Sequence, residues 1–187
     1  MPILQRERDI FPEQLLVDPQ LLTDNQRAWW CFYTLSRREK EFMRRLANWK
    51  IAHYGPIVPK RFRSPNGRLR TSYIPLFPNY VFVLASEEER YRAVTTACVS
   101  KHDQVIQWEQ LLCDLRQIHK VISAGVPLTP EARLDAGSRV RVRSGPFSGY
   151  EGLVIRREGK TRLLLSIRFL EQGVSIEMDE GILEPMR

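Results

Sequence analysis

The sequence lacks the motifs that mark common enzymes and metal proteins. Its 187 residues contain no P-loop, no GxSxG elbow, no HExxH pair and no EF-hand loop. The cysteines, Cys31, Cys98 and Cys113, form no CxxC pair, and the histidines show no ligand spacing. Neither a zinc ribbon nor a disulfide framework is indicated. We therefore expect no enzyme activity, no catalytic residues, no metal and no cofactor.

Long apolar runs are also missing. No segment approaches the roughly 20 apolar residues that cross a bilayer. The first residues, MPILQRERDIFPEQ, are charged and lack the apolar core of a signal peptide. We expect a cytoplasmic, monomeric protein with reduced and mostly buried cysteines and no membrane partner.

Acidic residues are scarce in the middle of the chain. The net charge is +7, and residues 28–134 carry 17 basic against 9 acidic side chains. Residues 37–70 hold eleven Lys or Arg, opposed only by Glu39 and Glu41. This concentration favours an anionic partner, with nucleic acid as the leading candidate. The alternative is that the charge only aids solubility.

Hydrophobic patterning predicts an α+β domain over residues 28–124, with an antiparallel sheet and helices packed on it. The expected elements are a strand at 29–35, a helix at 37–50, a basic hairpin turning at 64–67, a strand at 79–84, and helices from 87 and from 108. Ser36 and Glu39 have the spacing of a capping box for the first helix. Residues 1–27 contain three prolines and are expected to be a loosely attached or flexible extension.

The pattern changes after residue 124. Residues 125–134 hold two prolines and are predicted to be an interdomain linker. Residues 135–187 then alternate apolar and polar side chains in short runs, which predicts a small five-stranded β-barrel. We expect this segment to form only strands, because one proline and three glycines within residues 145–152 oppose a helix.

Residues 75–83, PLFPNYVFV, suggest a docking surface. Two prolines bracket Leu76 and Phe77, so the chain must turn before the strand begins. Such a turn would gather aromatic side chains, together with Tyr33, on a surface beside the basic region. The alternative is that the aromatic residues of this stretch are simply core.

Residues 137–154 form the second motif, in which a strand runs into Gly145-Pro146 and returns after Gly149. Gly152 lies inside the returning strand, where a glycine indicates a bulge or a close backbone approach. This stretch resembles the KOW motif. Trp29-Trp30, the run RREK at 37–40 and PLFPNYVFV occur in the order of the NusG N-terminal domain signature.

The sequence therefore resembles a bacterial NusG-type transcription elongation or antitermination factor over about residues 28–187. At position 79 this chain has Asn, where housekeeping members typically have Gly. In this residue the sequence resembles the specialised RfaH-like members. The run GPFSGYEG at 145–152 is closer to ordinary NusG.

The resemblance implies a NusG N-terminal domain followed by a KOW, SH3-like barrel. It implies that the clamp helices of the largest RNA polymerase subunit bind Tyr33, Phe77, Pro78, Tyr80 and Phe82. It also implies that non-template or upstream DNA lies near Arg37, Arg38, Lys40 and Arg44. The residues that match the KOW motif are Gly145, Pro146, Phe147, Gly149 and Gly152.

The function predicted from these residues is a non-enzymatic factor that suppresses pausing or termination, whose KOW domain recruits a ribosomal protein or a termination factor. One alternative is a ribosome- or RNA-binding KOW protein, which would not need the PLFPNY segment. A nucleic-acid-modifying enzyme is a third reading, and the sequence offers no metal-ligand or acid–base set for it.

Overall fold

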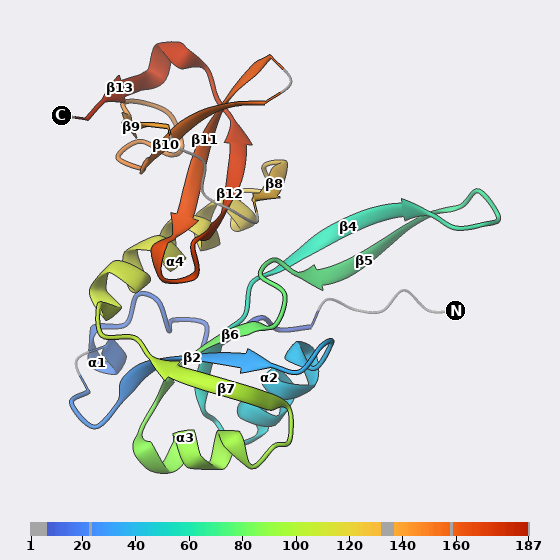
Figure 1. The fold of residues 1–187 in the computed structure, drawn as a ribbon, viewed down its shortest axis with the longest axis vertical. Coiled ribbons are helices and arrows are strands. Elements are labelled where there is room, and N and C mark those ends of the chain that lie inside the picture. Colours follow the sequence, from blue (N-terminus) through green and yellow to red (C-terminus); the bar gives the residue numbers. More distant parts are fainter. Residues whose placement is uncertain (1–6, 23, 132–136, 158, 187) are drawn as a thin grey trace. The chain divides into compact units, whose positions relative to one another are not determined.

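The computed structural model of the chain describes residues 7–22, 24–131, 137–157 and 159–186 (Figure 1). The chain divides into two compact units, residues 1–106 and 107–187. The first unit contains a five-stranded antiparallel sheet and a separate two-stranded hairpin, and the second contains a six-stranded antiparallel sheet. The sequence prediction of a mixed α and β chain with antiparallel sheets is confirmed.

The sheet of the first unit has the strand order β1-β3-β6-β2-β7. Its strands are β1 (Ile10–Phe11), β2 (Ala28–Thr34), β3 (Ala52–Tyr54), β6 (Tyr80–Ala85) and β7 (Val99–Gln104). The helices of this unit are α1 (Pro19–Leu22), α2 (Glu39–Asn48) and α3 (Glu87–Val94). The apolar runs at 29–35 and 79–84 form the central strands β2 and β6, as expected for strands buried on both faces.

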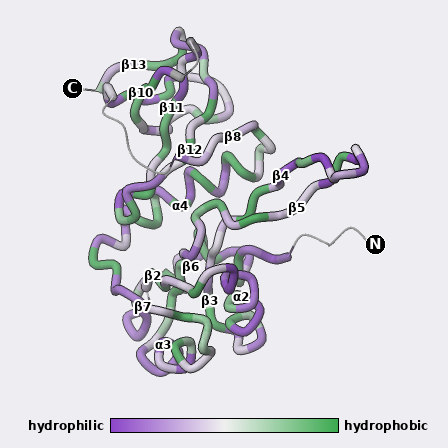
Figure 2. The backbone as a smooth tube through the Cα atoms, turned by 45° about the vertical axis from the view of Figure 1, so that its right-hand side comes forward, coloured by the Kyte–Doolittle hydropathy of each residue, from purple (hydrophilic) through white to green (hydrophobic). Residues whose placement is uncertain are grey.

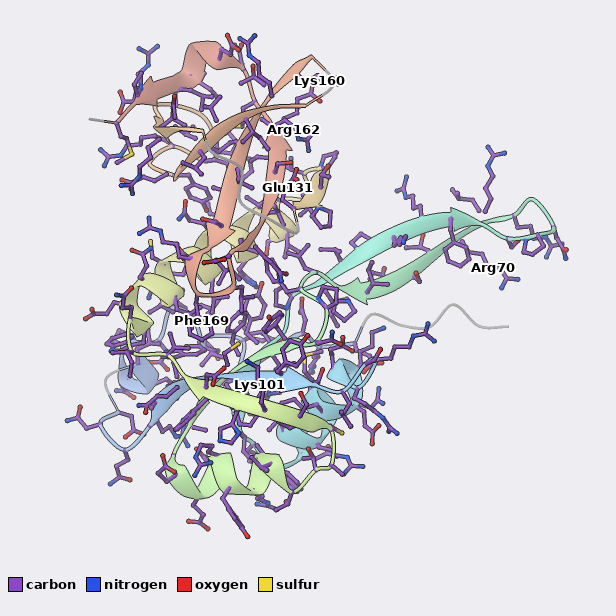
Figure 3. The ribbon with its side chains drawn as sticks, viewed as in Figure 1. Arg70, Lys101, Glu131, Lys160, Arg162 and Phe169 are labelled. Atoms are coloured by element: carbon purple, nitrogen blue, oxygen red, sulfur yellow. The ribbon has the colours of Figure 1, made fainter. Side chains whose placement is uncertain are left out.

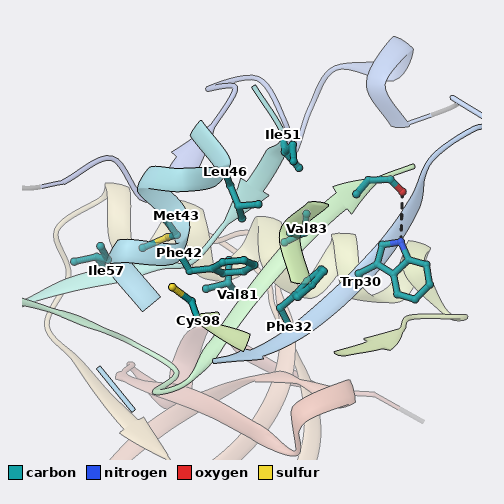
Figure 4. Close-up of a cluster of buried hydrophobic side chains, with 12 residues drawn as sticks. Trp30, Phe32, Phe42, Met43, Leu46, Ile51, Ile57, Val81, Val83 and Cys98 are labelled. Atoms are coloured by element: carbon teal, nitrogen blue, oxygen red, sulfur yellow. Dashed lines mark hydrogen bonds between the residues drawn. The ribbon is translucent and has the colours of Figure 1, made fainter. Parts of the chain in front are cut away.

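One face of this sheet packs against α2 (Figure 4). Trp30 and Phe32 point to this face because residues two apart on a strand share a side. The Phe32 and Phe42 ring centroids lie 5.3 Å apart, and Leu46 continues the helical stripe. The Trp30 indole Nε1 donates a hydrogen bond of 3.4 Å to the Ala85 carbonyl. Trp29, Cys31 and Tyr33 therefore lie on the opposite face.

The N-terminal segment is part of the fold, so the expectation of a loosely attached extension is wrong for its described residues. Strand β1 pairs with β3 at the sheet edge, and Leu15 and Leu16 are buried. The Asp9 carboxylate accepts from the Ile57 amide at 3.2 Å, and the Asp9 carbonyl accepts from the Gly55 amide at 2.8 Å. Burial of two leucines explains the attachment, which the prolines of this segment do not prevent.

Helix α2 begins two residues later than expected, and the predicted capping box is wrong. Its N-cap residue is Arg38, which makes no side-chain cap, and Glu39 is used elsewhere in the fold. A capping box occurs instead at α3, where the Ser86 hydroxyl accepts from the Glu89 amide and the Glu89 carboxylate accepts from the Ser86 amide.

The predicted hairpin consists of β4 (Ile57–Arg63) and β5 (Leu69–Pro75) and is confirmed. Its two strands pair only with each other among the described residues and extend away from the sheet of the first unit (Figure 1). Gly67, at φ +74°, occupies the turn position that requires a left-handed backbone. Hydrophilic residues predominate toward the tip (Figure 2).

The second unit has the strand order β13-β9-β10-β11-β12-β8. Its elements are α4 (Trp108–Ser123), β8 (Leu128–Glu131), β9 (Ser138–Val142), β10 (Glu151–Arg157), β11 (Lys160–Ile167), β12 (Gln172–Glu177), β13 (Leu183–Pro185) and two 3₁₀ turns, η1 (Arg168–Leu170) and η2 (Glu180–Ile182). Helix α4 packs against β11 and η1.

This sheet differs from the predicted five-stranded barrel. It has a sixth strand, β8, contributed by residues that the sequence places in the linker, and no ladder joins its edge strands β13 and β8 within the described part of the chain. Arg162 explains the extra strand, because its guanidinium donates to the Thr129 hydroxyl of β8 at 2.9 Å and to the Ser175 carbonyl of β12 at 2.8 Å. Ser175 in turn donates to the Glu131 carboxylate at 2.7 Å.

Candidate functional site

Two tyrosines meet at one end of the central strands of the first unit. Tyr33 and Tyr80 are direct cross-strand partners, and their rings pack edge to face with centroids 4.9 Å apart. Lys101, the partner of Tyr33 on β7, places its Nζ 5.8 Å from the Tyr33 ring centroid (Figure 3). Pro78 is exposed just before Tyr80. We refer to Tyr33, Pro78, Tyr80 and Lys101 as the tyrosine edge.

The loop before β6 holds this edge in place. Asn79 has φ +70°, a left-handed conformation that Gly adopts freely and that Asn tolerates better than most residues. The Asn79 carbonyl accepts from the Thr34 amide at 2.7 Å, and the Asn79 amide donates to the buried Glu39 carboxylate at 2.8 Å. The first residue of α2 therefore anchors the loop.

Three of the five residues expected to bind polymerase reach the surface. Tyr33 and Tyr80 are half-buried and Pro78 is exposed, whereas Phe77 is 2% exposed and Phe82 is fully buried. Phe77 and Phe82 are therefore not accessible to a partner in this structure. Partial burial, and next the neighbouring Tyr33, raise the pKa of the Tyr80 phenol above its ordinary value, so its hydroxyl is neutral at pH 7.

The expected nucleic-acid contacts lie at the start of α2. We refer to Arg37, Arg38, Lys40 and Arg44 as the α2 patch. Arg38 is ion-paired with Glu41, and the Arg44 Nη1 lies 2.7 Å from a Glu7 carboxylate oxygen. Arg37 and Lys40 form no ion pair with any described residue. Half of the patch is therefore engaged within the chain.

Glu41 organises the charges of α2. Its carboxylate also accepts from the Arg45 guanidinium at 2.7 Å, and Arg45 donates to the Thr96 carbonyl at 2.9 Å. Hydrogen bonds from Arg38 and then Arg45 lower the pKa of Glu41 below its ordinary value. Glu41 is therefore ionised at neutral pH and holds both arginines.

The second expected site is the turn between β9 and β10. Gly145 and Gly149 have φ +90° and +86°, and the Gly149 amide donates to the Val142 carbonyl at 2.8 Å. Phe147 is buried beneath this turn, with its ring centroid 5.6 Å from that of Tyr150, while Pro146 is exposed. A Cβ atom at Gly152 would lie 2.4 Å from the Leu164 carbonyl oxygen, so the backbones approach closely there.

The buried Cys31 thiol of the first unit is not poised to react as a nucleophile. Burial, followed by the nearby Asp103, raises the pKa of the Cys31 thiol to about 12, so it is protonated at neutral pH. Among the described residues, no group of three or more His, Cys, Asp or Glu is placed to hold a metal ion. In the same residues, no helix is both long and apolar enough to span a bilayer.

A comparison with protein families decides the identity of this chain. The family model described as "Transcription termination factor nusG" matches residues 27–125, which is more than half of the sequence. The chain belongs to the NusG family. As a NusG-family protein it is a transcription elongation or termination factor in the general sense, and NusG relatives generally bind RNA polymerase.

The other comparisons add little to this NusG assignment. A comparison with solved structures found a chain described as "Crystal Structure of MjSpt4:Spt5 complex conformation B", with 15% identity and a TM-score of 0.26. That match covers 84% of this chain and 95% of the other. The comparison with curated proteins found no match.

The NusG match contains the tyrosine edge, the α2 patch and the β4–β5 hairpin, whereas the turn between β9 and β10 lies outside it. Two residues of the candidate site were missed in the sequence. Glu39 looked like a capping residue, and Lys101 lies in a polar edge strand with no apolar alternation. Lys101 could have been found only by pairing that segment with the strand of Tyr33.

Proposed function

We propose that this NusG-family chain binds RNA polymerase through its tyrosine edge, at the clamp helices of the largest subunit. The observation that carries this proposal is the Tyr33–Tyr80 pair, which presents two half-buried aromatic rings packed edge to face. Aromatic side chains fixed in this way are typical of interface hot spots. The neighbouring Lys101, whose Nζ also lies 3.4 Å from the Asp103 carboxylate, adds a cation beside the Tyr33 ring.

The α2 patch is proposed to face non-template or upstream DNA. Arg37 and Lys40 have no carboxylate partner among the described residues, so both can bind phosphate without losing an existing ion pair. Together with the tyrosine edge, this patch would bind polymerase and nucleic acid at once. A ligand that binds the closed state of the polymerase better than the open state suppresses pausing and termination by shifting that equilibrium.

The second unit is proposed to act as a KOW module that recruits a ribosomal protein or a termination factor. The support is the turn between β9 and β10, in which two glycines with positive φ surround the buried Phe147. We also propose that the two edges of this sheet meet and close it into a barrel. We further propose that the protein is a specialised, RfaH-like member of the family.

Binding of the full-length protein to purified RNA polymerase tests the tyrosine edge. Tyr80→Ala and Tyr33→Ala should each weaken binding about tenfold or more, as hot-spot truncations do. Tyr91→Ala is the matched control, because Tyr91 is a 69% exposed tyrosine on α3, away from the edge. Folding of each variant is checked by circular dichroism.

The same measurements separate the two leading functions. If Tyr80→Ala binds polymerase as tightly as Tyr91→Ala, the tyrosine edge is not the docking site. If the parent protein binds ribosomes or RNA but not polymerase, the alternative of an RNA- or ribosome-binding KOW protein replaces this proposal. For the α2 patch, Arg37→Gln with Lys40→Gln should flatten the salt dependence of binding to a DNA-containing transcription complex while sparing free polymerase.

A further inference from the structure

The β4–β5 hairpin carries five cations and no carboxylate. The cations are all exposed and form no ion pair with a described residue: Lys60, Arg61, Arg63, Arg68 and Arg70. Two large apolar side chains, Phe62 and Leu69, are 44% and 66% exposed on the same hairpin. Cations without internal partners, gathered on one element, indicate an external polyanion.

The charges lie on both faces of the hairpin. Directly paired residues of an antiparallel ladder share a face. Lys60 pairs with Ser72 and Phe62 pairs with Arg70, so one face carries Lys60, Phe62 and Arg70. Arg61 pairs with Thr71 and Arg63 pairs with Leu69, so the other face carries Arg61, Arg63 and Leu69. Each face thus combines two cations with one apolar side chain, and Figure 3 shows Arg70 on this hairpin.

The root of the hairpin is fixed and its outer half is free. Ile57 and Val58 are buried, the Ile57 amide donates to the Asp9 carboxylate, and the Leu76 amide donates to the Pro56 carbonyl at 2.7 Å. From Pro59 onward every residue of β4 is exposed. At about 3.3 Å per residue, the five exposed residues of β4 span roughly 16 Å, so the free part is long enough to enter a nucleic-acid groove.

We propose that this hairpin inserts into the major groove of double-stranded DNA and contacts phosphates on both walls. The major groove of B-DNA, about 12 Å wide, admits a two-stranded β-ribbon. A ribbon that lay on a flat surface would use the cations of one face only. An A-form RNA duplex has a major groove too narrow for side chains to read. Single strands are bound mainly by stacking on several aromatic rings, whereas Phe62 is the one exposed aromatic side chain of the hairpin, because Tyr73, opposite Pro59, packs against the core.

This inference does not rest on polymerase binding, so it is tested without polymerase. The full-length protein is titrated against a fluorescently labelled, mixed-sequence DNA duplex at several salt concentrations, with anisotropy as the readout. One variant, Lys60→Gln with Arg70→Gln, removes the cations of one face. A second, Arg61→Gln with Arg63→Gln, removes those of the other. Each should weaken duplex binding about tenfold at low salt and reduce the slope of log K against log salt by about 1.8, since each phosphate contact contributes about 0.9.

The matched control is Arg156→Gln with Lys160→Gln, which also removes two exposed cations but takes them from ion pairs with Glu180 and Glu177. It should leave duplex binding and its salt slope unchanged. Equal losses in the control and in the hairpin variants would overturn the proposal, because binding would then depend on net charge alone. Loss in only one hairpin variant would overturn insertion between two walls.

Competition experiments identify which form of nucleic acid the hairpin prefers. Unlabelled DNA duplex should displace the labelled duplex better than RNA duplex or single-stranded DNA of the same sequence. Equal competition by RNA duplex would contradict insertion into a B-form groove. Stronger competition by single-stranded DNA, abolished by Phe62→Ala, would show that the hairpin stacks bases instead. A parent protein that binds no free duplex at low salt would refute the proposal, whatever the outcome of the polymerase assay.

Discussion

The α2 patch and the β4–β5 hairpin come from the same basic stretch of sequence, yet their charges are used differently. In α2, Arg38 and Arg45 are held by Glu41, and Arg44 is held by Glu7. The hairpin has no carboxylate, and none of its cations is paired with a described residue. Charge density alone therefore does not show which cations can bind a ligand.

The two regions also differ in how they are built into the fold. Glu39 at the start of α2 is buried and binds the loop of the tyrosine edge, and Phe42 and Leu46 of α2 fill the core of the first unit. Only Ile57 and Val58 anchor the hairpin at buried positions of β4. Substitutions in α2 should therefore change stability, whereas substitutions in the outer hairpin should change binding.

The largest effect on stability is expected for Glu39→Ala. This change removes the acceptor of the Asn79 amide and leaves that donor without its partner in a partly buried loop. The expected loss is about 2 kcal/mol in the free energy of unfolding, measured by urea denaturation. Glu39→Gln keeps an acceptor oxygen and should retain most of the stability. Glu88→Ala, an exposed glutamate of α3, is the control and should cost much less.

Glu41→Gln should make the α2 patch resemble the hairpin. The change removes the negative charge that pairs with both Arg38 and Arg45, so their charges become available to phosphate, although Arg45 keeps its hydrogen bond to the Thr96 carbonyl. The salt slope of duplex DNA binding should become steeper by up to about 1.8, while the free energy of unfolding should change little, because solvent screens exposed ion pairs. Glu87→Gln, which breaks the Glu87–Arg90 pair on α3, is the matched control. If both variants bind DNA alike, the α2 charges have no special role.

Part of this comparison could be predicted from the sequence. Glu41 is three residues after Arg38 and four before Arg45, the spacings at which side chains meet on a helix. The Asn66-Gly67 turn between two extended runs predicts the hairpin. Because successive side chains of a strand point to opposite faces, the sequence also assigns the hairpin cations to two faces. The Arg44–Glu7 pair could not be predicted, because it depends on where the N-terminal segment folds back.

Short polar strands were the main part of the fold that the sequence did not reveal. Strand β7, VSKHDQ, has no alternating apolar residues because it lies at a sheet edge, and β3 is three residues long. The burial of Phe77 and Phe82 agrees with the alternative that the aromatic residues of this stretch are core. The sequence could not decide between core and surface, since one face of a strand reads the same whether or not it is covered. Asn79 looked like a mark of specialisation, but its φ of +70° gives a backbone reason for Asn or Gly there.

Acid should weaken the folded first unit but not the charge of the hairpin. His53 is 1% exposed, its Nδ1 lies 2.9 Å from the Ile51 carbonyl, and its ring stacks on Phe11 of β1. Burial lowers the pKa of His53, against smaller opposing effects of the Ile51 carbonyl and Asp9. The unfolded chain therefore binds a proton at a higher pH than the folded chain does. The stabilisation is complete above the ordinary pKa of about 6.5 and declines as the pH falls from there toward the lowered pKa.

Urea denaturation at about pH 7.5 and about pH 5.5, on either side of the ordinary histidine pKa, measures this loss. Between the two pH values, the free energy of unfolding should fall less for His53→Gln than for the parent protein. Lys and Arg remain charged throughout this range, so binding of the hairpin to DNA should persist where the protein is still folded. An unchanged loss in His53→Gln would assign the acid sensitivity to another group.

The smallest effect on stability is expected for Arg61→Gln with Arg63→Gln. Both side chains are exposed and unpaired within the described chain, so their removal breaks no internal contact and buries no polar atom. The free energy of unfolding should stay within about 0.5 kcal/mol of the parent value, even though duplex binding falls. Arg45→Gln is the matched comparison in α2. It removes hydrogen bonds to the Thr96 carbonyl and to Glu41, and should cost about 1 kcal/mol. If both variants lose the same free energy of unfolding, the hairpin cations stabilise the fold as much as Arg45 does. The proposed difference between the α2 arginines, which have internal partners, and the hairpin arginines, which have none among the described residues, would then be wrong.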